Sequence, residues 1–273
     1  LHITRTLHHP NTMAKTQGEK TSTGKNVAEF EVTSGITLSR TLVPTLPPNY
    51  LSRKHLFSLL EHPAPSTTVL IAPAGYGKTS LVAEWALAHR DRVIWLTITE
   101  SDSLEDMSAL FIQATRNIIP NFAMWFEREP GVRPVEIVRR WGNELLAIGG
   151  DFIFVIDNLR EHTSRDVDIA TRLVEQFPPN IQFVTIRRDK IETVYATFSS
   201  RGPLSVIGAS DLAFTESEVA ALASMHKIDY GNCEIRESLE AAHGWPAAVS
   251  MLLYQIAKNK KPIDFEKLVA SQS

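Results

Sequence analysis

Cysteine is almost missing from the sequence: Cys233 is the single one among 273 residues. An internal disulfide is therefore excluded, and this composition fits a reducing compartment. Long apolar runs are missing too, because no stretch approaches the ~18 uninterrupted apolar residues of a membrane span. The polar N-terminus has no apolar core of the kind found in signal peptides. We therefore expect a cytoplasmic protein with no membrane contact.

An excess of charge of one sign is also missing. The chain carries 28 Lys and Arg against 31 Asp and Glu, a formal net charge of -3. Nucleic acid is usually bound by a strongly basic face, so this balance gives no case for DNA contact by these residues. The histidines are scattered, and no Cys/His cluster has the spacing of a metal site.

The N-terminal 40 residues differ in composition from the rest. Residues 1–40 are rich in Thr, Ser, Lys, Gly and His and have no apolar period, which predicts a disordered tail. The chain opens on Leu1, and Met13 follows. The first twelve residues are therefore interpreted as an upstream start or a tag scar.

Between residues 41 and 208, short β-branched runs alternate with helical stripes. Continuous apolar strands separated by helices predict the α/β class, with a doubly wound, mainly parallel sheet covered on both faces. The expected strands are 68–72, 93–98, 152–156, 181–186 and 204–207. The expected helices contain the apolar stripes 81–88, 107–118, 135–148 and 167–177.

After residue 208 the strand pattern stops. Thr215 and Glu218 have the spacing of a capping box. Two further helical stretches are expected around 234–243 and 246–257. Residues 209–273 are therefore predicted to form a small all-helical domain behind the α/β domain of residues 41–208.

One segment, "IAPAGYGKTSLV" (residues 71–82), has the pattern of a phosphate-binding loop. Its Gly-Lys-Thr lies between a predicted strand and a predicted helix, which is the context that a P-loop requires. Glycines let the backbone curl so that successive N–H groups point at a phosphate, and the helix adds its positive N-terminal end. The alternative is a strand, turn and helix that contain Gly-Lys-Thr by chance. The residues expected to hold the nucleotide are Ala74, Gly75, Tyr76, Gly77, Lys78, Thr79 and Ser80.

Lys78 and Thr79 have separate expected tasks in this loop. Lys78 can reach the β- and γ-phosphates, and the Thr79 hydroxyl can ligate Mg²⁺. Ala72 stands where the pattern usually has its first glycine, so the turn has to open there without a left-handed residue. No Asn-Lys-x-Asp motif of the guanine-reading type is present, which favours ATP or ADP.

The predicted strand "FIFVID" ends on a carboxylate, Asp157. Ligands of doubly wound sheets bind beyond the carboxyl ends of the strands, so Asp157 is expected to hold the Mg²⁺ shell, usually through water. The alternative is that it only caps its strand. Many P-loop ATPases have a second acidic residue next, which orients the attacking water; Asn158 stands here, and an amide cannot accept a proton. Glu161 or a carboxylate of "ESDSLED" (100–106) could substitute.

Arg187 and Arg188 stand at the end of the fourth predicted strand. A guanidinium at this place could reach a γ-phosphate and so report its presence. For each arginine the alternative is an ordinary surface salt bridge.

Seven segments together resemble one known group of proteins. In chain order they are "TLVP", "APAGYGKTSLVAEWA", "VIWLTI", "FVIDN", "FVTIRRD", "DLAFTESEVAALA" and "GWPAAV". They are similar to the N-terminal nucleotide-binding region of the large MalT-like, ATP-dependent LuxR-family transcription regulators. Those regulators belong to the STAND class of signal-transducing P-loop ATPases. The resemblance covers roughly residues 41 to 257.

The resemblance implies roles that spacing alone does not give. It implies that Ala72 is tolerated in the loop and that Arg187 is the sensor arginine. It implies that "GWP" is the GxP motif, so that Pro246 packs on the adenine; a plain helix-start proline is the alternative. Arg53 falls where the family has an adenine-proximal arginine.

The resemblance also sets the expected function. It implies an ATP/ADP-binding, Mg²⁺-dependent switch that takes part in transcription regulation, with self-association in the ATP state. Asn158 departs from the acidic residue usual in these proteins, so slow or absent hydrolysis is expected, at most a slow ATPase. DNA would be bound only by C-terminal parts of a longer parent protein, which residues 1–273 do not include. The alternative function is a P-loop enzyme, either a motor-type ATPase or a small-molecule kinase.

Overall fold

The computed structural model describes residues 38–99, 101–158, 175–188, 198–199 and 201–263. All of these belong to one compact unit, Thr37–Ser273. The first 37 residues of the predicted tail, and most of the predicted helix 167–177, lie outside the described residues. Within the described part of the chain, no helix combines the length and the apolar character needed to cross a membrane.

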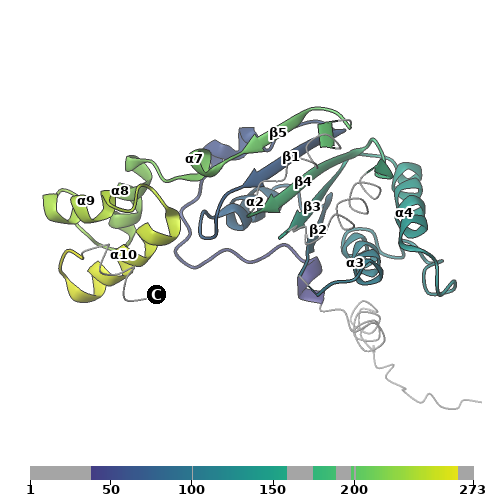
Figure 1. Cartoon of the computed structure of the whole chain (residues 1–273), viewed down its shortest axis with the longest axis horizontal. Coiled ribbons are helices and arrows are strands. Elements are labelled where there is room, and N and C mark those ends of the chain that lie inside the picture. Colours follow the sequence, from purple (N-terminus) through teal and green to yellow (C-terminus); the bar gives the residue numbers. More distant parts are fainter. Residues whose placement is uncertain (1–37, 100, 159–174, 189–197, 200, 264–273) are drawn as a thin grey trace, which may run out of the picture. The chain divides into compact units, whose positions relative to one another are not determined.

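The described strands form one parallel sheet in the order β2-β3-β4-β1-β5, and Figure 1 shows them side by side. The predicted α/β class and the predicted parallel sheet are confirmed. Every residue of β1, β3 and β4 is buried, which explains the apolar runs 69–71 and 152–156 within them. The strands are β1 (Ser66–Ile71), β2 (Val93–Thr97), β3 (Phe152–Asp157), β4 (Ile181–Arg187) and β5 (Leu204–Ile207).

Helices pack on the two faces of this sheet. On one face, Trp85 and Leu81 of α2 (Lys78–Leu87) share a buried cluster with strand residues such as Val155. The other face is aromatic: the rings of Phe111 and Trp141 lie 5.0 and 5.2 Å from the ring of Phe154. These two rings come from α3 (Leu104–Arg116) and α4 (Pro134–Ile148). The sheet therefore presents its carboxyl edge between two covered faces.

Local signals set the ends of these helices. Ser103 and Asp106 form a capping box at the start of α3, and Pro134 occupies the first turn of α4. Gly149, with a φ of 79°, ends α4 just before β3. The positive φ explains why a glycine stands there.

Two short 3-10 helices, η1 (Leu38–Thr41) and η2 (Lys54–Leu59), precede the sheet. Residues 38–40, which the sequence assigns to the tail, belong to η1. Arg40 donates to the Thr97 carbonyl at 3.0 Å and to Asp102 Oδ1 at 3.0 Å. These contacts attach η1 to the end of β2.

The helical C-terminal part has a core of its own. Buried Val219, Leu222 and Leu252 belong to one cluster. The capping box predicted for Thr215 and Glu218 is present at the start of α8. The helices are α7 (Ala209–Leu212), α8 (Glu216–Met225), α9 (Cys233–Glu240) and α10 (Pro246–Asn259).

Candidate functional site

The loop between β1 and α2 has the backbone form that phosphate binding needs. Gly75 has a φ of 80° and Gly77 a φ of 71°, and Gly77 is the N-cap of α2. Only glycine adopts such values without strain. Ala72 is buried at the end of β1 and is not among the described residues with positive φ. The turn therefore opens without a left-handed residue at Ala72, as the sequence predicts.

Lys78 lies over the inner side of this loop. Its Nζ donates to the carbonyls of Ala72 at 2.5 Å and Pro73 at 2.8 Å. Burial lowers the pKa of Lys78, and the charge of Arg188 lowers it further, while Asp157 acts in the opposite direction. The two carbonyls hold the ammonium at the start of α2, where an arriving phosphate would meet it.

Thr79 and Asp157 meet at the end of β3. The Thr79 hydroxyl lies 3.2 and 3.1 Å from the two carboxylate oxygens of Asp157. Burial raises the pKa of Asp157, although the Thr79 hydrogen bond, the Asn158 N–H and the charges of Lys78 and Arg188 lower it. The net direction is upward, so this carboxylate costs free energy when it ionises.

The chemistry of this pair fits Mg²⁺. A hydroxyl oxygen and a carboxylate converge on one point, and Mg²⁺ prefers oxygen ligands. The described residues include no group of three or more His, Cys, Asp or Glu that could hold a metal without other ligands. Mg²⁺ at this place would therefore share Thr79 and Asp157 with phosphate oxygens and water, as it does in phosphate sites.

Asn158 has a structural role. Its φ is 66°, a conformation that asparagine tolerates better than most residues. Its side-chain Nδ2 donates to the carbonyl of Ile98 at 3.1 Å. The amide therefore links the ends of β3 and β2 at the position where a second carboxylate would orient water.

Two of the other carboxylates considered as substitutes have structural partners. Asp102 pairs with Arg40 and accepts from the Thr99 N–H at 2.7 Å. Asp106 accepts from the Ser103 N–H at 2.9 Å in the α3 capping box. Glu161 lies outside the described residues.

The register of β3 and β4 separates the two arginines. Asp157 is paired with Ile186, so these two side chains point to the same face of the sheet. Ile186 belongs to the cluster around α2. Arg187, the next residue, therefore points to the opposite face, and it is buried. Exposed Arg188 follows the strand, and its charge acts on both Lys78 and Asp157.

The "GWP" segment and the residue after it contact backbone carbonyls of the phosphate loop. Trp245 Nε1 donates to the Ala74 carbonyl at 3.1 Å, and the Ala247 N–H donates to the Gly75 carbonyl at 3.0 Å. Pro246 is buried and occupies the first turn of α10, where its missing N–H costs nothing. Its predicted contact with adenine stays a prediction.

Arg53 binds the linker, residues 212–215, that leads into α8. Its guanidinium donates to the Leu212 carbonyl at 2.8 Å and to Glu218 at 2.6 and 3.1 Å, and it lies 5.0 Å from the centre of the Phe214 ring. Burial alone would raise the pKa of Glu218, but the hydrogen bonds from Arg53 and Thr215 bring it below its usual value. Arg53 therefore joins segments that are 165 positions apart in the chain.

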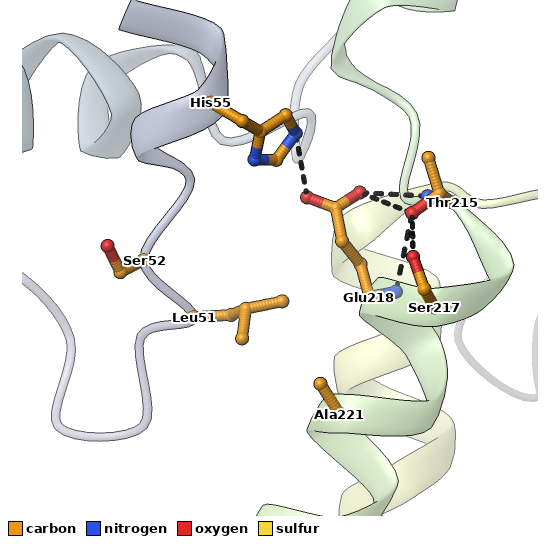
Figure 2. A pocket seen from close by; sticks show the side chains of 7 residues that line it. All are labelled: Leu51, Ser52, His55, Thr215, Ser217, Glu218 and Ala221. Atoms are coloured by element: carbon orange, nitrogen blue, oxygen red, sulfur yellow. Dashed lines mark hydrogen bonds and ion pairs between the residues drawn. The ribbon is translucent and has the colours of Figure 1, made fainter.

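A pocket of about 340 Å³ lies beside this ion pair. Figure 2 shows Leu51, Ser52 and His55 on one side of it and residues of α8 on the other. His55 Nε2 lies 3.6 Å from Glu218 Oε1. The predicted adenine-proximal position of Arg53 is thus next to a concave surface, although the guanidinium itself is engaged by the linker.

No protein-family model matches the chain. Among solved structures, a STAND protein with a tetratricopeptide repeat sensor from Pyrococcus horikoshii aligns with a TM-score of 0.60 and 16% identity, over 77% of this chain and 31% of that one. Two others align less well: Cdc6p from Pyrobaculum aerophilum (TM-score 0.46, 14% identity, 68% of this chain and 51% of that chain) and Aeropyrum pernix ORC1 in complex with DNA (0.47, 15%, 78% and 62%). Their scores are too low to support a comparison of function.

The sheet order and this alignment show that the chain shares the fold of the Pyrococcus STAND protein. The chain spans about a third of the length of the Pyrococcus protein that it matches. This likeness concerns the fold, and the MalT-like identity expected from the sequence stays a prediction.

Of the residues predicted from sequence, the P-loop NTPase fold brings several together. Lys78, Thr79 and Asp157 meet at the carboxyl edge of the sheet. In the loop, Ala74, Gly75 and Gly77 are exposed, while Tyr76 and Ser80 are half-buried. The hydrogen bonds of the Arg53 guanidinium go instead to the linker and α8.

Sequence reasoning missed Glu84, a buried acid on the apolar side of α2. Its carboxylate accepts from the Tyr50 hydroxyl at 2.9 Å, the Ser52 hydroxyl at 2.5 Å and the Arg53 N–H at 3.1 Å. The available signal was its position, since a glutamate among the apolar residues of a buried helix needs partners. Glu84 fixes the segment that carries Arg53 onto the helix that carries Lys78.

We predict that Asp157→Asn stabilises the nucleotide-free protein at neutral pH. The raised pKa of Asp157 means that the folded state binds the proton more tightly than the unfolded state. Wild-type stability therefore falls as pH rises above the ordinary aspartate pKa, and the variant escapes this loss. Denaturant unfolding from pH 4 to 8 without Mg²⁺ should show an advantage that shrinks at low pH.

The control for this prediction is Glu136→Gln. Hydrogen bonds from Arg139 and Arg140 lower the pKa of Glu136 to about 2, so the sign is reversed and the variant should gain no stability at neutral pH. An Asp157→Asn protein less stable than wild type at pH 7 would contradict the buried-charge explanation.

Proposed function

We propose that this chain is an ATP/ADP-binding signal-transduction switch module. The observation that carries the proposal is the meeting of Lys78, Thr79 and Asp157 at one edge of a parallel sheet, next to a loop with two left-handed glycines. Lys78 would neutralise phosphate charge, and Thr79 and Asp157 would hold Mg²⁺. When bound, Mg²⁺ would neutralise negative charge on the phosphates.

The module is proposed to belong to a longer, MalT-like transcription regulator of the LuxR family. The seven sequence segments support this, and so does the small share of the Pyrococcus chain that is matched. That protein has a tetratricopeptide repeat sensor, and a sensor and a DNA-binding region would likewise stand in other parts of the parent protein. Self-association in the ATP state is part of the same proposal.

The proposed sensor of the γ-phosphate is Arg188 in preference to Arg187. The register argument supports this, because Arg187 and Asp157 point to opposite faces of the sheet. The charge of Arg188 acts on Lys78 and Asp157. An exposed guanidinium can reach toward a third phosphate without the cost of leaving a buried environment.

Hydrolysis is proposed to be slow. In place of a second carboxylate stands Asn158, whose amide donates to a backbone carbonyl. An amide held in this way neither accepts a proton nor adds negative charge near the water. A protein that keeps its nucleotide can hold a signalling state.

Lys78→Ala should weaken ATP binding at least tenfold, about 1.4 kcal/mol, because the loop dipoles alone cannot neutralise the phosphates. Isothermal calorimetry measures the change. Lys258→Ala, which removes an exposed lysine of α10, is the matched control and should bind as wild type does. Equal affinity in the Lys78 variant would remove the phosphate-loop assignment.

Arg188→Ala should weaken ATP binding by about tenfold more than ADP binding, since one charged hydrogen bond to the third phosphate is lost. Arg187→Met, which keeps an apolar stem at a buried position, should leave the ATP to ADP affinity ratio unchanged. The measurement is the affinity for both nucleotides. If the ratio moves only in the Arg187 variant, the sequence-based choice of Arg187 is right.

Asn158→Asp should raise ATP turnover severalfold or more without tightening ATP binding. A carboxylate cannot donate to Ile98, so it is free to turn toward the attacking water and accept its proton. Asn158→Gly is the control, because it tolerates the positive φ and loses the same hydrogen bond without adding a carboxylate. Phosphate release checks both variants; a wild-type rate already near ~10 s⁻¹ would contradict the switch.

A further inference from the structure

Trp245 and Ala247 touch the phosphate loop on its carbonyl side. Their two hydrogen bonds end on consecutive carbonyls, those of Ala74 and Gly75. The approach is close: a Cβ added to Gly75 would lie 2.5 Å from Ala247 Cβ and 2.8 Å from Trp245 Nε1. Gly75 is therefore needed for the contact as well as for its left-handed φ.

Peptide geometry gives these two bonds a consequence on the other side of the loop. The C=O and N–H of one trans peptide point in opposite directions. A carbonyl of Ala74 that points to Trp245 therefore turns the Gly75 N–H away from Trp245, and the Gly75 carbonyl does the same for the Tyr76 N–H. These are N–H groups of the kind that a P-loop offers to phosphate.

Lys78 acts on the preceding peptide in the same manner. Its Nζ donates to the Pro73 carbonyl, which orients the Ala74 N–H in the opposite direction. The Ala74 N–H thus points away from Lys78, whereas the Gly75 and Tyr76 N–H groups point away from Trp245 and Ala247. The two N–H groups that can face a phosphate are therefore those whose partner carbonyls are bound by Trp245 and Ala247.

Backbone contacts keep the "GWP" segment in place. The Phe214 N–H donates to the Gly244 carbonyl at 2.7 Å. Gly244 has a φ of 70°, and a Cβ there would lie 2.6 Å from the Phe214 carbonyl oxygen. Phe214 belongs to the linker that Arg53 binds. The two donors are therefore positioned by a chain of specific contacts.

We propose that Trp245 is a positioning residue that orients one N–H offered to phosphate, that of Gly75, through the Ala74 carbonyl. The proposal rests on the proposed nucleotide-binding function and deepens it. Through Trp245 and Ala247, the helical part responds to the conformation of the loop, whichever nucleotide is bound. By thermodynamic linkage, phosphate binding then strengthens the docking of the segment as much as docking strengthens phosphate binding.

The first experiment uses Trp245→Phe in the full chain, which keeps a ring and removes the N–H donor. The affinities for ADP and for inorganic tripolyphosphate should both fall by a similar factor, roughly 3- to 10-fold. Trp125→Phe is the matched control: its indole is half-buried and donates to Glu144 Oε2 at the same 3.1 Å, away from the loop. This control should bind both ligands as wild type does.

The two ligands separate the proposal from stacking of the indole on a base. A loss for ADP without a loss for tripolyphosphate would mean that Trp245 reads the base, and it would overturn the proposal; so would unchanged binding of both. Failure of the nucleotide-binding function itself looks different, because the wild-type chain would then bind neither ligand.

A second experiment measures docking directly by amide hydrogen exchange in α10. In wild type, tripolyphosphate should slow this exchange, and Trp245→Phe should reduce the slowing. Gly75→Ala and Gly77→Ala form a matched pair, because both place a Cβ at a positive φ. Only the Cβ at position 75 meets Trp245 and Ala247. Gly75→Ala should speed exchange in α10 without any ligand, and Gly77→Ala should not. Equal exchange in the two glycine variants would overturn the proposed contact.

Discussion

The buried guanidinium of Arg53 is the interaction on which the arrangement of the site depends. The guanidinium binds Glu218 and the carbonyls of Leu212 and Ala213. The backbone N–H of Arg53 donates to Glu84 of α2. Burying such a pair is costly, and removing one partner of a buried pair typically destabilises a protein by about 3–5 kcal/mol. Here one arginine satisfies several acceptors at once, so the helix that carries Lys78 and the linker into α8 are held by the same residue.

A series of contacts connects Arg53 with the phosphate loop. Phe214 lies against Arg53 and binds Gly244 through its backbone. The next residue, Trp245, binds the Ala74 carbonyl. The loop is thus supported from inside by Lys78 and from outside by the "GWP" segment. Such support from two sides fits a loop that has to present its N–H groups to a ligand before the ligand arrives, because preorganised donors need no rearrangement on binding.

Much of the fold could be predicted because its signals are local. Buried parallel strands are continuous apolar runs, and the ends of the helices coincide with Ser103, Pro134 and Thr215. The phosphate loop was readable for the same reason, since Gly75, Gly77 and Lys78 act within one turn of chain. Each of these features depends on residues only a few positions apart.

The contacts between distant segments could not be predicted in this way. Arg53 and Glu218 are 165 positions apart, and Trp245 and Ala74 are 171 apart; nothing in the local pattern of either residue indicates its partner. Glu218 was recognised as a helix cap, and its second role as the partner of Arg53 was invisible. The proposal of Arg188 in preference to Arg187 rests on the register of β3 against β4, because a shift by one residue exchanges the two faces of the sheet.

The buried carboxylate of Asp157 and the amide of Asn158 both bear on whether a nucleotide would be kept or hydrolysed. Burial makes the Asp157 carboxylate costly in the absence of a cation, so free energy is stored where Mg²⁺ and phosphate would release it. Asn158, one residue later, ties the end of β3 to the carbonyl of Ile98 and leaves no carboxylate there to activate water. Under the proposed function, both features favour retention of the nucleotide over its turnover. In the proposed role of Trp245, the hydrogen-bonded carbonyls of Ala74 and Gly75 would let the helical part respond to that nucleotide through the loop backbone.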